Sequence, residues 1–152
     1  MRDTLLGRVF MTGNIFVDTN IFVYSRDISE PEKQARALHI LRELWDFGTG
    51  RISTQVLNEY YVTVTKKLSP GLNATEAWQD IEDLFAWQPL PVDEKVLAKA
   101  RICQLEYNLS WWDSLIVSAA FFCDCTAIFS EDLNHGQSYL GIPVENPFNS
   151  DF

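Results

Sequence analysis

Apolar residues along this chain follow two patterns, short continuous runs and longer stretches with helical spacing. Short runs rich in β-branched and aromatic residues stand at 14–18, 51–54, 126–129 and 142–144, a pattern typical of buried strands. Apolar residues three and four positions apart predict helices over about 19–25, 31–47, 55–68, 74–85, 94–105 and 111–123. Residues 88–92 contain two prolines, so we expect an extended connector or a short edge strand there.

The longest predicted helix carries a recognisable start signal. Ser29 is expected to cap it, with Pro31 in its first turn, where a missing N–H costs nothing. Leu38, Leu41 and Trp45 then recur at helical spacing. We therefore expect an amphipathic helix here.

The alternation of strand and helix patterns predicts a parallel sheet with helices on both faces, because parallel strands need crossover connections. We therefore expect an α/β fold, a three-layer α/β/α sandwich around a central, mainly parallel sheet. Residues 14–148 would form this single domain, with residues 1–13 as an N-terminal extension and 149–152 as a C-terminal tail. Met11 is an alternative translation start, because the first strand begins three residues later.

Composition limits the function classes. The chain has 152 residues, 47% of them hydrophobic, which is enough to build the core of one domain. Its formal net charge of −9 argues against a sequence-blind nucleic-acid binder, but acids gathered at a metal site are compatible with a nuclease. With three cysteines, no apolar leader and no membrane-length run, we expect reduced core thiols in a cytoplasmic protein without a membrane anchor.

Four carboxylates stand where a parallel sheet would bring them together. Asp18 and Asp132 come just after apolar strands, and Glu59 and Asp113 lie on helices rich in apolar residues. Because ligands bind beyond the carboxyl ends of parallel strands, all four could converge on one crevice. Such acids repel one another as free anions, and oxygen ligands without Cys or His favour Mg²⁺ or Mn²⁺, which supports phosphodiester hydrolysis.

Each acid also has a purely structural interpretation. Asp18 could cap the helix after it, and Asp113 fits the last position of a capping box begun by Ser110. Glu59 could be an ordinary solvent-facing helix residue, and Asp132 could cap a turn. Spacing alone leaves both interpretations open.

The segments around these acids resemble the four motifs of PIN-domain ribonucleases. In chain order they are residues 16–20 (FVDTN), 53–60 (STQVLNEY), 112–116 (WDSLI) followed by two alanines at 119 and 120, and 128–133 (IFSEDL). Each motif alone is weak, but four in this order within residues 14–148 make a specific match.

The resemblance implies an endoribonuclease that hydrolyses RNA with water activated by Mg²⁺ or Mn²⁺. Many single-domain relatives are VapC-type toxins of toxin–antitoxin pairs, so it also implies a homodimer and an inhibiting antitoxin. Carried over position by position, the metal-binding catalytic acids are Asp18, Glu59, Asp113 and Asp132, and their polar supports are Asn20 and Ser130.

Neighbouring residues leave several points open. Glu131 adjoins Asp132, although the register of the motif favours Asp132. Asn134 stands where many relatives carry a further aspartate, which leaves the number of metals open. His135 could touch substrate, but a turn role is favoured, and His39 is expected to be structural or on the surface.

Substrate and partner surfaces are less defined. The low basic content favours a few contacts to a shaped RNA over broad salt-driven affinity. Basic residues that flank the first two motifs are Arg26, Lys33, Arg36, Lys66 and Lys67, of which the lysine pair could instead stabilise a helix end. Aromatic residues expected mainly in the core, or else in a dimer or antitoxin groove, are Trp78, Phe85, Trp87, Trp111 and Trp112.

Two other functions compete with the nuclease. A receiver-like signalling domain also places acids beyond parallel strands and binds Mg²⁺. It needs a lysine at the end of a late strand, where this chain has Ser130, Glu131 and Asp132. A catalytically silent PIN-fold binding module is the second alternative, against which the presence of all four acids weighs.

Overall fold

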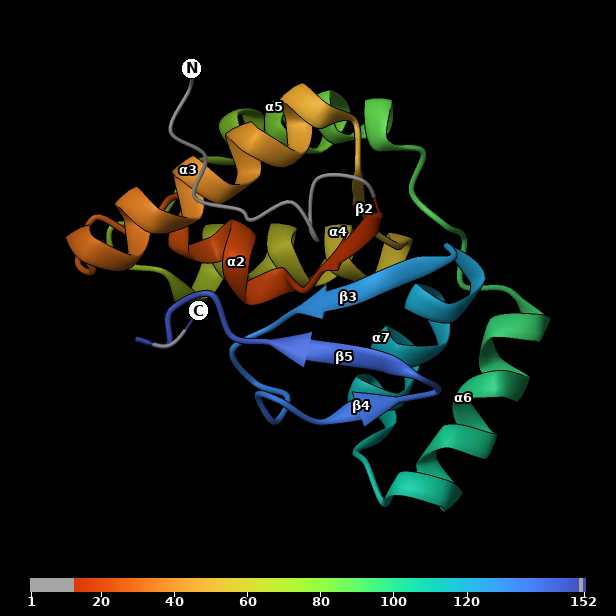
Figure 1. The fold of residues 1–152 in the computed structure, drawn as a ribbon. Helices are drawn as coiled ribbons and strands as arrows, with labels where there is room; N and C mark the ends of the chain where they lie inside the picture. The colour runs from red at the N-terminus through yellow and green to blue at the C-terminus, as the bar shows by residue number, and fades with distance from the viewer. Residues whose placement is uncertain (1–12, 151) are drawn as a thin grey trace.

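A computed structural model describes residues 13–150 and 152, and within them five strands form one sheet (Figure 1). The strands lie in the order β2-β1-β3-β5-β4, and neighbours are parallel except for the antiparallel pair β4 and β5. Their bounds are β1 (Asn14–Val17), β2 (Gly50–Arg51), β3 (Cys125–Phe129), β4 (Ser138–Tyr139) and β5 (Ile142–Glu145). The predicted α/β fold with a mainly parallel central sheet is confirmed.

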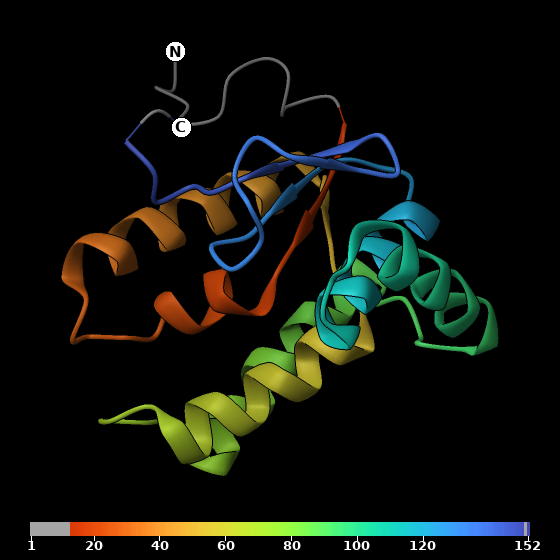
Figure 2. The same ribbon diagram turned by 90° about the horizontal axis from the view of Figure 1, so that it is seen from below.

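Helices connect the strands, and Figure 2 shows α4, α5, α6 and α7 grouped on one side of the sheet. None of the helices in the described part of the chain is both long and apolar enough to cross a membrane. The α-helices are α2 (Thr19–Tyr24), α3 (Pro31–Phe47), α4 (Thr54–Val62), α5 (Ala74–Leu84), α6 (Glu94–Tyr107) and α7 (Trp111–Phe122). A π-helical segment, η1 (Thr63–Lys67), extends α4, and a 3₁₀ turn, η2 (Phe85–Trp87), follows α5.

Both faces of the central strands are covered. Successive side chains of a strand point to opposite faces, yet residues 15–17 of β1 and 127–129 of β3 are all buried. This explains why these strands are continuous apolar runs rather than alternating ones. The sheet is therefore the middle layer of the fold, as the sequence predicted.

The structure differs from the predicted strands in two places. The strand expected at 51–54 is displaced, because β2 ends at Arg51 and Ser53 makes only a single parallel bridge to Leu90. Ser53 is already the N-cap of α4, so the chain leaves the sheet there. The two-residue strand β4 was not predicted, because so short a segment carries no periodicity. The expected extension at residues 1–13 and the alternative start at Met11 lie almost entirely outside the described residues.

The start of α3 differs from the prediction. Its N-cap is Glu30, which makes no side-chain capping bond, while Pro31 occupies the first turn as expected. The Ser29 hydroxyl donates instead to the Asp27 carboxylate within the preceding turn. Ser29 is therefore a turn residue and not the cap, because α3 begins one residue later than expected, with Glu30 as its N-cap.

The buried face of α3 is also rotated from the pattern that we noted. Ala37, Ile40 and Leu44 are fully buried, whereas Leu38 and Trp45 are exposed. The helix has apolar residues on more than one side, so spacing alone does not select the face that meets the sheet.

Candidate active site

The register of the two central strands places Asp18 beside Ser130. Val17 of β1 pairs in parallel with Phe129 of β3, so the residues that follow leave the sheet side by side. The Asp18 N–H donates to the Phe129 carbonyl (2.9 Å), and the Ser130 hydroxyl donates to Asp18 Oδ2 (2.7 Å). The sheet thereby fixes the Asp18 carboxylate at the carboxyl ends of these strands.

Asp18 is also the N-cap of α2, and it is almost fully buried. Its Oδ1 accepts a hydrogen bond from the Thr19 N–H (2.7 Å), and the residue is 4% exposed. Burial raises the pKa of Asp18 from 3.8 to about 7; the bonds from Ser130 and Thr19 oppose the rise, and the charges of Asp132 and Glu59 add to it. Asp18 is therefore the helix cap that its structural interpretation predicted, and the same carboxylate lies near two other acids.

The first turn of α2 joins Asp18 to two further acids. The Thr19 hydroxyl donates to Glu59 Oε2 (2.8 Å), and Asn20 Nδ2 donates to Asp132 Oδ2 (3.2 Å). Asn20 Oδ1 in turn accepts from the Glu131 N–H (3.2 Å), which anchors the loop after β3. Asn20 thus has the supporting position that the sequence predicted, whereas the role of Thr19 was not anticipated.

Gln55 links Glu59 to the start of α7, next to Asp113. Its Nε2 donates to Glu59 Oε1 (2.9 Å), one helical turn away, and to the Trp112 carbonyl oxygen (3.2 Å) at the start of α7. Asp113 follows Trp112, and its N–H donates to Ser110 Oγ (3.1 Å) as the capping pattern predicted. Sequence reasoning missed Gln55, although its four-residue spacing from Glu59 was a usable signal.

The four acids form one electrostatic group. Burial raises the pKa of Asp113, a bond to Ser110 opposes the rise, and the charges of Asp132 and Glu59 add to it. The same two charges also raise the pKa of Asp18. Acids from four separate chain segments therefore lie close enough to repel one another, which is what the strand-end argument predicted.

Glu59 and Asp132 open onto a cleft of about 840 Å³. Asn20 and Thr19 line it as well, between these two acids. The buried Asp18 lies next to the lining residues through its bond to Thr19. The acidic group is thus reachable from a cavity large enough for a small ligand.

The donor set of this group suits a hard divalent cation. It consists of carboxylate, amide and hydroxyl oxygens without Cys or His, which is the ligand chemistry of Mg²⁺ and Mn²⁺. Burial is the main cause of the raised pKa values of Asp18 and Asp113, and a cation would relieve the smaller contribution from the charges of Asp132 and Glu59. Across residues 13–150 and 152, however, no three acidic, His or Cys side chains are arranged to hold one ion. The type and charge of these ligands fit a divalent cation. In this structure the carboxylates of Asp18, Glu59 and Asp132 are hydrogen-bonded to polar side chains.

A model of the PIN domain matches residues 15–137. This chain belongs to the PIN domain family, a family of nucleases. No relative among the curated proteins matches it. Among solved structures, the chain is similar to the crystal structure of VapBC2 from Rickettsia felis bound to a DNA fragment from their promoter. The TM-score is 0.61 at 18% identity, over 87% of this chain and 97% of that one, so the likeness concerns the fold.

Glu131 of this PIN domain is engaged away from the acidic group. Tyr24 donates its hydroxyl proton to Glu131 Oε1 (2.7 Å), and Lys33 Nζ donates to Oε2 (2.8 Å). Asp132, in contrast, lines the cleft. The structure therefore assigns different positions to the two adjacent acids, with Asp132 in the one that the motif register indicated.

Two other residues near the fourth motif have structural partners. Asn134, at the position of the missing aspartate, donates to Gln137 Oε1 (3.3 Å). His135 Nδ1 accepts from the Asn146 N–H (2.9 Å), which agrees with the favoured turn role. His39 lies on α3 with an exposed side chain, as expected.

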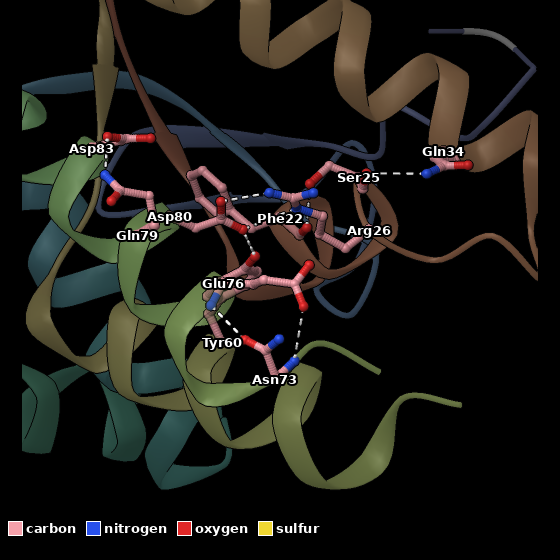
Figure 3. A network of polar contacts seen from close by, with 10 residues as sticks. All are labelled: Phe22, Ser25, Arg26, Gln34, Tyr60, Asn73, Glu76, Gln79, Asp80 and Asp83. Carbon is pink, nitrogen blue, oxygen red and sulfur yellow. Dashed lines mark hydrogen bonds and ion pairs between the residues drawn. The ribbon is translucent and has the colours of Figure 1, made fainter. Parts of the chain in front are cut away.

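A polar network joins α4 to α5 and to the end of α2 (Figure 3). The buried Tyr60, next to Glu59, donates its hydroxyl proton to the Asp80 carboxylate on α5. Arg26, just after α2, contacts the same carboxylate through Nε (3.0 Å) and Nη2 (2.6 Å). This network ties α2, α4 and α5 together, so it holds the helix that carries Glu59.

Most basic residues that we considered for RNA contact have other partners in this PIN domain. Arg26 pairs with Asp80, Lys33 with Glu131, and Arg36 donates to a backbone carbonyl. Lys67 alone among them lines the cleft.

The prediction that the aromatic residues are mainly in the core is only partly correct. Trp87 is buried, but Trp78, Phe85 and Trp112 are exposed. Trp78 and Phe85 contact each other edge to face on the surface. The pattern misled because aromatic residues at helical spacing also occur on solvent-facing sides.

Proposed function

We propose that this PIN domain is an endoribonuclease that hydrolyses RNA phosphodiester bonds with Mg²⁺ or Mn²⁺. The observation that carries this function is the convergence of acids from four chain segments, since Glu59 and Asp132 line one cleft and are bonded through Thr19 and Asn20 to the turn after Asp18. A group of repelling carboxylates beside a cleft is a site for a divalent cation.

The residues have separable roles in this function. Bound there, the cation would supply positive charge to the phosphoryl oxygens and activate water. Ser130 and Asn20 hold the carboxylates of Asp18 and Asp132 in place through the bonds described above. Thr19 and Gln55 fix one oxygen each of the Glu59 carboxylate. The residues that hold the metal would be Asp18, Glu59, Asp113 and Asp132.

The decisive experiment is cleavage of total cellular RNA by the purified chain, with Mg²⁺, with Mn²⁺ and with EDTA. We expect metal-dependent cutting that is lost in Asp18→Asn and Asp113→Asn. Asp83→Asn is a matched control, because Asp83 is an exposed acid on α5 outside the cleft. Equal cutting by all variants, or cutting unaffected by EDTA, would contradict the assignment of the acids.

The partners of the nuclease follow from its relatives. We further propose that the chain is a cytoplasmic toxin of a type II toxin–antitoxin pair and that it forms a homodimer; the similar solved structure holds VapBC2 on promoter DNA, which supports the antitoxin partner. A small gene next to this one would then encode the antitoxin. Co-expression should restore growth that the chain alone inhibits, and light scattering should give the mass of a dimer for the chain alone.

The two alternatives make different predictions for the same sample. A catalytically silent module would bind RNA or protein without cutting under any metal condition. A receiver-like domain would take up a phosphoryl group from a small donor, but the PIN family match gives that alternative no support.

A further inference from the structure

Trp112 has an exposed indole at the cleft, and the catalytic function proposed above does not use it. It is 62% exposed, more than any other tryptophan or phenylalanine in the described part of the chain. Trp112 also lines the cleft that Glu59 and Asp132 share. A large apolar ring left in water forfeits the stabilisation that burial would bring, so an exposed one beside acids suggests a ligand contact.

The backbone holds this indole next to the acids. The Trp112 carbonyl oxygen accepts from Gln55 Nε2 (3.2 Å), and the same nitrogen donates to Glu59 Oε1. Asp113 is the next residue, in a helix turn that Ser110 caps. The ring is therefore anchored at its base, and its position relative to the acidic group is set by α4 and α7.

The walls of the cleft suit a flat apolar group that is attached to an anion. Apolar side chains lining it beside Trp112 are Val23, Val62, Val92 and Leu115. Among the residues that line the cleft, Lys67 is cationic and three are acidic, namely Asp27, Glu59 and Asp132. Charge alone would not draw a polyanion into this cleft, so an RNA strand needs an apolar contact there.

We infer that Trp112 is a stacking platform for an unpaired base of single-stranded RNA, with Lys67 contacting a phosphate of the same strand. This assignment rests on the proposed function, because it places the RNA in the cleft of the acidic group. Unstacked bases bind aromatic side chains, whereas a paired base inside a duplex has no free face. The platform would therefore set which nucleotide of the strand lies against the acidic group.

Binding should be measured separately from cleavage. A fluorescein-labelled single-stranded RNA would be titrated with the protein in Ca²⁺ instead of Mg²⁺ and followed by fluorescence anisotropy. Stacking of one base corresponds to about 1–3 kcal/mol, so Trp112→Ala should raise Kd about 5- to 150-fold, while Trp112→Phe should stay within about threefold of wild type. Trp78→Ala is the matched control, because Trp78 is also exposed (49%) but lies on α5 outside the cleft. The same RNA annealed into a duplex should bind wild type as weakly as the single strand binds Trp112→Ala.

Several outcomes would overturn the platform. One is that Trp112→Ala and Trp78→Ala bind the single strand with equal affinity. Another is that Trp112→Ala loses as much affinity for the duplex as for the single strand. The third is that wild type binds no RNA. A change in self-association without a change in RNA affinity would show that the indole packs against a second copy of the chain. Cleavage assays in Mg²⁺ test the nuclease independently. Trp112-dependent binding without cutting refutes only the enzyme, and cutting that Trp112→Ala leaves unchanged refutes only the platform.

Discussion

Replacing Asp18 with asparagine should reverse a pH-dependent loss of stability in the metal-free protein. Burial raises the pKa of Asp18 from 3.8 to about 7. Since one pKa unit corresponds to about 1.4 kcal/mol, keeping this carboxylate charged in the folded state costs on the order of 4 kcal/mol. Asparagine removes the charge, and its single amide oxygen can keep either the bond from the Thr19 N–H or the one from the Ser130 hydroxyl, whose oxygen already accepts from the Asp132 and Leu133 N–H groups.

The sign of the effect follows from the two protonation equilibria. The folded pKa is raised, so the stability that protonation contributes is fully present below pH 3.8 and is lost as the pH rises through about 7. The asparagine variant has no such proton. Between about pH 8 and pH 5, wild type should therefore gain about 2–3 kcal/mol relative to Asp18→Asn.

The assay is urea denaturation in EDTA at a series of pH values, followed by tryptophan fluorescence. The difference in the free energy of unfolding between the two proteins is the measured quantity, because most other titrating groups cancel in it. We expect Asp18→Asn to be the more stable protein near pH 8 and to lose that advantage near pH 5. A difference that is constant with pH, or that grows on acidification, would refute the claim that burial raises this pKa. Asp83→Asn should give a flat difference.

Three further substitutions test other contacts. Asp132→Asn should lower RNA cleavage at least about tenfold while Glu131→Gln stays within about twofold, since only the first residue lines the cleft; similar rates for the two would contradict this division. Gly50→Ala should lower the free energy of unfolding by about 1–3 kcal/mol in urea, because its Cβ would lie 2.4–2.6 Å from the Trp87 ring, and an unchanged midpoint would disprove that overlap. Tyr60→Phe should lower the free energy of unfolding by about 1–3 kcal/mol in the same assay, because it removes the hydroxyl bond to the partly buried Asp80 carboxylate, and no loss would mean that this bond in the network of Figure 3 adds nothing to stability.

Local pattern predicted the order of the main elements well. The apolar runs of β1 and β3 and the capped start of α7 were correctly located from sequence. These features depend on residues a few positions apart, whose burial and capping follow from local chemistry. The strand at 51–54 was wrong because Ser53 pairs with the distant Leu90 as the chain enters α4, and the cap at Ser29 was wrong because α3 begins one residue later, after Glu30.

The sequence by itself determined that acids follow apolar strands and that their segments resemble the PIN motifs. Only the tertiary structure decided that Asp18 bonds to Ser130, which lies 112 positions away. The same holds for the contrast between Glu131, paired with Lys33, and Asp132, which lines the cleft. Strand register and helix rotation set these contacts, and both depend on packing between distant segments that no local spacing records. Burial and charge environment follow from that packing, and so do the raised pKa values of Asp18 and Asp113.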